Sequence, residues 1–509
     1  MIKKFTFILL LFTFLSSTLR SQTEEFKLIF PLEDNTLTWL GESQEGLRIG
    51  PWVAYDQDSS YFHRGRYNQG LKDDTWYIFI DKVERARMMY LSDTLNGAYI
   101  LFHTNRTIAV KANFKDGKLH GQYVANRIDG TELDKGQFVE GLKEGVWTTK
   151  NDDGIVSISA NYKNGLLEGQ YDQFDEYGFK ILTTEYKNGL LNGPWTKFDF
   201  DGQPIEIGQM VNGNRDGKWE YFYAPGRIAA IEFYDDGKKT GNWKAYHFNG
   251  RIASEISYED DIQVGTETNY YENKKIASLS YFRLGMLDSL YTSYYPNGAK
   301  EQEGNFKLGS EEGLWKYYHD NGMISGFGGF NAGYREGSWK YFDQQGNLSG
   351  EGAFKNGEEN GQWYFYYENG QLESIGVYDN GEKDGLWGYF HKDGSHMKEE
   401  SWSDGKLVSV TPFTTDEGKT LKNGNLIAGN GSLINYRADG TKFSEGSYSD
   451  GYPDGIWTFY DEKERKLTKG ELKKGVKQGP WRIYSKSGRV IETQRFLNGE
   501  LITSDRSNY

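Results

Sequence analysis

Histidine and carboxylate side chains are the residues of this chain whose types could support acid–base or metal chemistry. His247, His319 and His391 follow one another at equal intervals along the chain. In the meander of β-strands deduced below, each interval comprises about six strands, or roughly 29 Å at ~4.8 Å per strand. Zinc ligands lie about 2 Å from the metal, so no two of these histidines can share one ion. His391 and His396 form the closest pair, and we interpret them as residues that flank a turn.

The acidic residues show no spacing that would build a catalytic or calcium site. Pairs such as Asp235-Asp236 and Glu358-Glu359 fall mostly in predicted turns, where Asp caps its own backbone and Glu faces solvent. A calcium loop would need ligands at strict alternate spacing. The sequence also has no cysteine, no nucleophile elbow and no Walker loop. It therefore predicts a protein that is not an enzyme, with no catalytic, cofactor-binding or metal-binding residue.

The main pattern in the sequence is a period of about 24 residues, a length that is typical of a tandem array. When Phe330 is counted as position 0, glycines fall at positions 3, 7 and 16, Trp339 at position 9 and Phe342 at position 12. Phe354 starts the next copy. About 19 such repeats extend from residue 43 to residue 495.

Twelve of the 14 tryptophans occupy position 9 of a repeat. They form a candidate aromatic ladder, which either binds a partner or holds neighbouring repeats together, and the structural interpretation is the one that we favour. The ladder residues of the regular repeats are Trp195, Trp219, Trp243, Trp315, Trp339, Trp363 and Trp387.

Each repeat is predicted to be a β-hairpin. Turn pairs such as Asn164-Gly165 and Asn380-Gly381 alternate with segments rich in strand formers. Hairpins joined by short turns pair with their sequence neighbours. We therefore expect an all-β fold, an elongated single-layer antiparallel meander of about 19 hairpin repeats, curved or twisted. Positions 9 and 12 differ in parity, so either both faces carry aromatic stripes or a bulge realigns them.

The repeats resemble MORN repeats, in particular the bacterial MORN variant with the pattern G-x-x-x-G-x-W-x-x-Y-x-x-x-G. Gly333, Gly337, Trp339, Phe342 and Gly346 match this pattern, with Phe in the Tyr position. The resemblance implies an elongated sheet of consecutive hairpins. It also implies a role in protein–protein interaction or assembly, and bacterial variants are often labelled as antitoxin components.

The N-terminal segment Met1–Gln22 has the layout of a secretory signal. Lys3 and Lys4 precede an apolar run, and small polar residues lead to Ser21. We predict cleavage between Ser21 and Gln22 and export to the periplasm, the outer membrane or the exterior. No stretch is long enough to span a bilayer, so no transmembrane segment is expected in the mature chain. Loss of the signal takes the net charge from −14 to −17, which disfavours nucleic acid and anionic lipid as partners.

The period and its interruptions divide the chain into eight segments. These are a signal peptide at 1–21, an N-terminal cap at 22–42, MORN-variant repeats at 43–257, degenerate repeats at 258–305, further repeats at 306–401, irregular repeats at 402–447, repeats at 448–495 and a C-terminal cap at 496–509.

These features predict an exported, non-enzymatic repeat protein that binds another protein, or scaffolds an assembly, through an extended β-surface. One alternative is a carbohydrate-binding or cell-wall-binding array, which the run Trp315-Lys316-Tyr317-Tyr318 superficially suggests. Another is an antitoxin-like partner of a toxin, which rests on the family resemblance alone and disagrees with an export signal. A hydrolase is the least favoured function.

Overall fold

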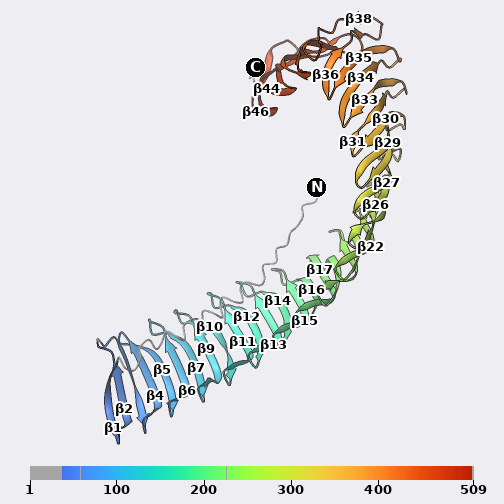
Figure 1. Cartoon of the computed structure of the whole chain (residues 1–509). Helices are drawn as coiled ribbons and strands as arrows, with labels where there is room; N and C mark the ends of the chain where they lie inside the picture. The colour runs from blue at the N-terminus through green and yellow to red at the C-terminus, as the bar shows by residue number, and fades with distance from the viewer. Residues whose placement is uncertain (1–36, 58, 225, 507–509) are drawn as a thin grey trace. The chain divides into compact units, whose positions relative to one another are not determined.

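The computed structural model describes residues 37–57, 59–224 and 226–506 (Figure 1). All regular secondary structure in these residues is β-strand. The predicted cleavage point at Ser21–Gln22 lies outside the described residues. The chain divides into two compact units, one of residues 1–228 and 233–238, and one of residues 229–232 and 239–509.

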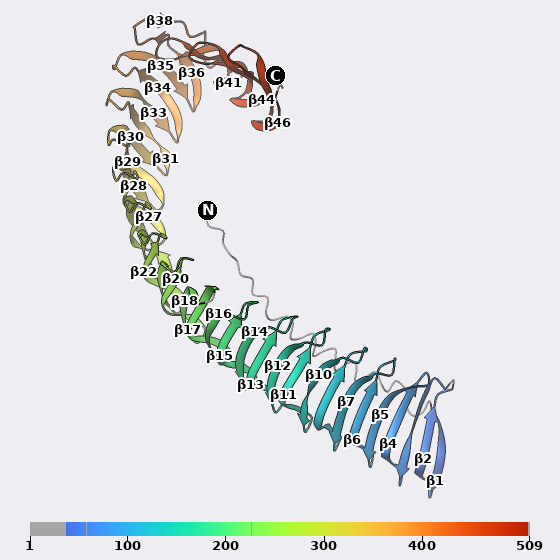
Figure 2. The ribbon, with the colours of Figure 1, turned by 180° about the vertical axis from the view of Figure 1, so that it is seen from behind.

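The first unit is a single layer of strands in which each strand pairs antiparallel with its sequence neighbour (Figures 1 and 2). Its strands are β1 (Thr38–Gln44), β2 (Leu47–Tyr55), β3 (Tyr61–Asn68), β4 (Leu71–Ile80), β5 (Val83–Leu91), β6 (Thr94–Phe102), β7 (Ile108–Lys115), β8 (Lys118–Leu119), β9 (Gly121–Asn126), β10 (Glu132–Val139), β11 (Leu142–Lys150), β12 (Val156–Lys163), β13 (Leu166–Phe174), β14 (Lys180–Lys187), β15 (Leu190–Phe198), β16 (Pro204–Val211) and β17 (Asn214–Ala224). Strands β18 (Arg227–Asp235) and β19 (Lys238–Lys239) contribute residues to both units.

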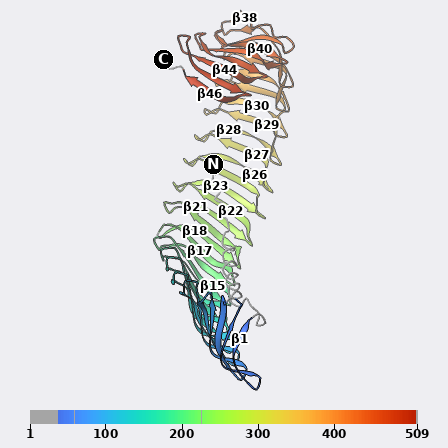
Figure 3. The ribbon, with the colours of Figure 1, turned by 90° about the vertical axis from the view of Figure 1, so that its left-hand side faces the viewer.

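The second unit continues the same hairpin pattern, and Figure 3 shows β21 to β30 following one another. Its strands are β20 (Gly241–Tyr246), β21 (Ile252–Glu259), β22 (Ile262–Tyr270), β23 (Ile276–Arg283), β24 (Met286–Leu287), β25 (Ser289–Tyr294), β26 (Lys300–Lys307), β27 (Ser310–Tyr318), β28 (Ile324–Asn331), β29 (Tyr334–Phe342), β30 (Leu348–Lys355), β31 (Glu358–Glu359), β32 (Gly361–Tyr366), β33 (Leu372–Asp379), β34 (Glu382–Phe390), β35 (His396–Ser403), β36 (Lys406–Val410), β37 (Phe413–Thr414), β38 (Thr420–Leu421), β39 (Gly431–Tyr436), β40 (Lys442–Ser449), β41 (Tyr452–Pro453), β42 (Gly455–Tyr460), β43 (Lys466–Lys473), β44 (Val476–Tyr484), β45 (Val490–Leu497) and β46 (Glu500–Arg506).

The predicted all-β antiparallel meander is confirmed. Strands β1–β36 belong to one sheet, β37 pairs with β38, and β39–β46 form a further sheet. The described residues contain 46 strands, more than two per repeat, because in several repeats a break divides one strand into a two-residue and a six-residue piece. Asn360, for example, lies between β31 and β32, and its backbone N–H donates to the carbonyl of Ala353.

The turns form where the sequence places left-handed residues. Asn356 and Gly357 both have positive φ, 52° and 91°. That combination is the one a two-residue type I′ hairpin turn requires, and Asn and Gly tolerate it at the lowest cost. The turn reverses the chain, so that β30 pairs with β31 and β32.

The two faces of the sheet differ in their side chains, and both carry aromatic rings. On one face, which we call the aromatic face, Trp339 packs edge-on against Phe330 and Phe354. On the opposite face, which we call the polar face, Phe342 stacks on Phe327. The difference in parity between positions 9 and 12 therefore puts their side chains on opposite faces.

The core of this single layer is a contact, present in most repeats, between the position-9 tryptophan and a glycine of the preceding strand. Trp363 lies over Gly352, where an added Cβ would come within 2.1 Å of the indole. The indole Nε1–H donates to the carbonyl of Ala353 at 3.1 Å. Ten of the twelve position-9 tryptophans have a glycine eleven residues earlier, at position 22 of the preceding repeat. The indole of Trp363 thus fills space that a side chain would otherwise occupy, and its polar atom is satisfied across the hairpin.

The irregular segment 402–447 begins where this contact is replaced. Glu400 stands at the glycine position, and the residue eleven places later is Thr411 instead of tryptophan. Glu400 is 9% exposed. Its carboxylate accepts hydrogen bonds from Tyr389 and Trp402 and pairs with Lys398 at 2.6 Å. A buried ionic network therefore takes the place of the indole.

Filling the glycine position should destabilise the array. Gly352→Ala places a methyl group into the Trp363 ring. We expect the free energy of unfolding to fall by about 3 kcal/mol, the upper end of the usual cost of overpacking a core. Urea denaturation and the hydrogen-exchange protection of β30 and β32 measure the effect. Gly388→Ala is the matched control, because its added methyl would meet Ile375 and Phe390 at an ordinary 3.5 Å. Equal losses for both variants would contradict the interpretation.

The Glu400 network should make this segment sensitive to acid. Burial pushes the pKa of Glu400 up, but Lys398, its hydrogen bonds and Lys383 outweigh burial and hold the pKa below its usual 4.5. A carboxyl whose folded pKa is depressed contributes stability above its unfolded pKa and loses it as the pH falls below about 4.5.

Glu400→Gln should therefore destabilise the segment at pH 7 by about 3 kcal/mol, because Lys398 loses its partner. It should also flatten the dependence of stability on pH below 4.5. Thermal unfolding between pH 3 and pH 7 measures both effects. Glu399→Gln, at a neighbouring half-exposed carboxylate, is the control. A Glu400→Gln profile as steep as that of the parent chain would refute the assignment.

Candidate functional site

The predicted tryptophan ladder is mainly a buried structural element. Trp219, Trp315, Trp339, Trp363 and Trp387 are each 1–3% exposed. Trp195 and Trp243 are half-buried. These two residues are the ones that lack the glycine eleven residues earlier, because Thr184 and Glu232 stand there. The five buried indoles therefore expose little ring surface to solvent.

Cationic side chains cover most of these rings from above. In eight repeats an Arg or Lys at position 5 lies 4.0–5.1 Å from the centroid of the position-9 indole, a cation–π distance. These residues are Arg48, Lys72, Lys143, Arg215, Lys239, Arg335, Lys383 and Lys477. Burial lowers the pKa of Lys383 because desolvation disfavours its charge. The sequence analysis did not identify these cations, although Lys or Arg recurs four residues before the tryptophan and could have indicated them.

Two repeats carry an acid at position 5. Glu311 precedes Trp315, and Glu359 precedes Trp363. At Trp363 the structure has a hollow of about 350 Å³, which the rings of Tyr341, Phe365 and Tyr378 line together with Glu359 and Trp363. The acid and the surrounding rings therefore share one concave site on the aromatic face.

The polar face carries a recurring hydrogen-bonded triad. Tyr366 donates to Glu351 at 3.0 Å, and Lys340 pairs with the same carboxylate at 2.9 Å. Hydrogen bonding to Lys340 is the main cause that lowers the pKa of Glu351. Burial, and to a lesser extent the hydrogen bond to Glu351, raises the pKa of Tyr366 to about 12. Tyr270, Tyr318 and Tyr460 each donate to a glutamate fifteen residues earlier in the same way.

The same face also carries exposed apolar side chains at position 8, and two of them, Leu314 and Ile456, lie in repeats with a triad. Position 8 directly precedes the aromatic residue of position 9 (Tyr291 after Leu290, tryptophan in the other four repeats), so its side chain faces the polar side of the strand. In five repeats this residue is Leu, Ile or Val and is more than half exposed. These residues are Val146, Leu290, Leu314, Leu386 and Ile456. The polar face thus combines fixed charges with apolar side chains that protein packing leaves uncovered.

The histidines at position 13 connect neighbouring repeats. The Nε2 atoms of His247, His319 and His391 lie 2.7–2.9 Å from backbone carbonyls 23 residues later, and His103 makes the same contact. Tyrosines at this position, such as Tyr367, donate to the equivalent carbonyl. Within the part of the chain that the structure describes, no group of three potential ligands could hold a metal ion.

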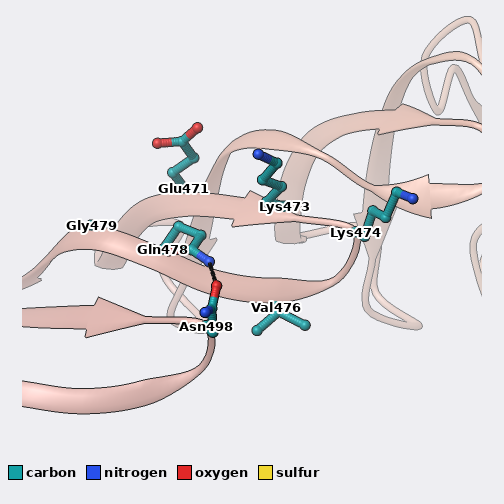
Figure 4. Close-up of a pocket in the computed structure, with 7 residues that line it drawn as sticks. All are labelled: Glu471, Lys473, Lys474, Val476, Gln478, Gly479 and Asn498. Carbon is teal, nitrogen blue, oxygen red and sulfur yellow. Dashed lines mark hydrogen bonds between the residues drawn. The ribbon is translucent and has the colours of Figure 1, made fainter.

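A second hollow lies beside the last hairpins. Figure 4 shows Gln478 donating to Asn498, at 2.8 Å, between Glu471, Lys473 and the exposed Val476. Its volume is about 640 Å³. The lining residues are mostly exposed, so this hollow is a shallow surface feature between turns.

The residues that the structure describes include no helix long and apolar enough to cross a membrane. No curated protein matches the chain. Among solved structures, a TcdB2–TccC3–Cdc42 crystal structure is 11% identical, over 90% of this chain and 30% of that chain, with a TM-score of 0.13. A Photorhabdus luminescens Tc holotoxin pore is 10% identical, over 90% and 32%, with a TM-score of 0.13. This chain spans about a third of those chains, and TM-scores this low support no shared fold or function.

The model of one repeat family matches the chain six times. The family is described as the MORN repeat variant, and it matches residues 239–260, 263–283, 287–308, 311–326, 335–356 and 359–380. These matches lie in the repeats whose hairpins, indole contacts and turns are described above. Residues 239–380 of this chain therefore consist of MORN repeats of the variant type.

Proposed function

We propose that this chain is an exported, non-enzymatic scaffold that binds another protein through the polar face of its repeats. The observation that carries the proposal is the recurrence of exposed apolar side chains at position 8, each 53–59% exposed, two of which, Leu314 and Ile456, share their repeat with a hydrogen-bonded Lys–Glu–Tyr triad. Exposed apolar groups with a polar surround are typical of protein interaction sites. The triads fix their own side chains in advance, which lowers the entropic cost of binding.

A glycan-binding array is the second candidate, and one observation favours it. Tyr177 and Phe200, in equivalent turns of successive repeats, are 72% and 80% exposed. Aromatic rings that are open to solvent can stack on sugars, whereas the buried ladder tryptophans cannot. This candidate therefore rests on the turn edge of the first unit and not on the tryptophan ladder.

Binding through the polar face predicts a specific loss. With the purified chain as bait in an envelope extract, Leu290→Lys/Leu314→Lys should reduce the recovery of a stoichiometric protein partner at least about tenfold, because two apolar contacts are lost. Quantitative mass spectrometry of the eluate measures the recovery. Leu284→Lys/Leu308→Lys is the matched control, since these leucines are also exposed but lie in turns.

Retention on peptidoglycan or glucan that Tyr177→Ser/Phe200→Ser abolishes would favour the glycan candidate instead. Equal recovery with both leucine variants would refute binding through position 8.

Export predicts the location of a fused reporter. Alkaline phosphatase joined after Gln22 should be active, because this enzyme folds only outside the cytoplasm, and the secreted chain should begin at Gln22. N-terminal sequencing of the secreted protein measures the cleavage point. Replacement of Leu9 and Leu10 by Arg should abolish the phosphatase activity, since a charged core no longer acts as a signal. An inactive fusion with the unaltered segment would contradict export.

A further inference from the structure

The aromatic face of residues 306–401 carries charges that alternate in sign at position 5. Glu311, Arg335, Glu359 and Lys383 occupy this position in four successive repeats. The Arg335 guanidinium lies 4.7 Å from the Trp339 centroid, and the Lys383 ammonium lies 4.1 Å from that of Trp387. The repeat between them has the same indole, Trp363, but an acid where its neighbours have a cation. The chain therefore supplies the cation itself in two repeats and not in the one between them.

The hollow at this repeat has the chemistry of a cation site. Its volume is about 350 Å³, within the range of small-ligand pockets, and four aromatic rings line it. Trp363 is 3% exposed and forms the floor, while Tyr341, Phe365 and Tyr378 are half-buried around it. Aromatic rings attract cations through their negative faces, and the Glu359 carboxylate adds a full negative charge.

The protein leaves the Glu359 carboxylate without a cation. Among the described residues, no ion pair or side-chain hydrogen bond involves it, although it is half-buried. The carboxylate lines the hollow together with the rings of Tyr341 and Tyr378. Its charge adds to burial in raising the pKa of Tyr378. At Tyr341 burial raises the pKa most, Arg335 lowers it, and Glu359 raises it by less.

The cations of the adjacent repeats are already engaged. Arg335 contacts Trp339, Phe354 and the Tyr341 hydroxyl. Lys383 contacts Trp387 and donates to Tyr389 at 2.8 Å.

We propose that the hollow formed by Tyr341, Glu359, Trp363, Phe365 and Tyr378 binds a basic side chain, lysine or arginine, of a partner protein. The bound cation takes the place over Trp363 that Arg335 and Lys383 take over their own tryptophans, and Glu359 neutralises it. The site lies on the aromatic face, opposite to the surface of the proposed function, so either surface can fail its test without affecting the other.

The first test measures the binding of a minimal basic probe to the purified chain. The probes are the peptides Gly-Gly-Arg-Gly-Gly and Gly-Gly-Lys-Gly-Gly, with citrulline in place of arginine as the uncharged isostere. Saturation-transfer NMR should show saturable binding of both basic peptides and none of the citrulline peptide. Glu359→Gln should weaken binding about tenfold, the loss of one charged contact. Glu358→Gln, at the exposed neighbouring acid, should leave it unchanged.

The second test places a cation of the chain itself in the site. Glu359→Arg gives this repeat the side chain that Arg335 provides one repeat earlier. It should abolish peptide binding while leaving the thermal midpoint equal to or above that of the parent chain. This outcome separates occupation of the site from unfolding. Peptide binding that persists in Glu359→Arg, binding that is equal in Glu359→Gln, or equal binding of the citrulline peptide would each overturn the proposal.

Discussion

The contact of an indole with a glycine across a hairpin is the interaction on which the rest of this structure depends. A single-layer sheet has no second layer to bury its side chains, so its apolar area must be hidden within the face itself. The indole of Trp363 achieves this by lying over Gly352 and donating to the carbonyl of Ala353. Repetition of one local contact therefore replaces a globular core, and stability becomes a sum over neighbours.

The same contact frees other positions for recognition. Because the indole and glycine hold adjacent hairpins together, position 5 above the ring can be Arg335, Glu359 or Lys383 without loss of the fold. Position 8 can likewise be Leu314 or Gln362. An array of this kind keeps its backbone constant and varies its surface, as binding loops do on a rigid scaffold.

The sequence was sufficient to predict the hairpin period, the strand class and the antiparallel pairing, because Trp339 and its equivalents recur with turn pairs at fixed offsets. The sequence was not sufficient to predict which side chains lie on which face of the sheet. Parity left open whether Trp339 and Phe342 lie on opposite faces or are realigned by a bulge, and only the structure shows that they lie on opposite faces and that Gly352 accommodates a ring. The hollow beside Glu359 depends on side chains from four strands, and no spacing along the chain reveals that they converge. His391 was interpreted as a residue that flanks a turn, and in the structure its ring also connects two repeats.

The indole and its glycine belong to successive repeats, which has a consequence for how such genes can change length. Recombination that removes one whole repeat between residues 304 and 376 still leaves glycine eleven places ahead of each surviving tryptophan. Removal of residues 401–446 would instead bring the Glu400 carboxylate beneath Trp457. Loss of one whole repeat therefore preserves the contact within residues 304–376, whereas a deletion that joins Glu400 to the repeat of Trp457 does not.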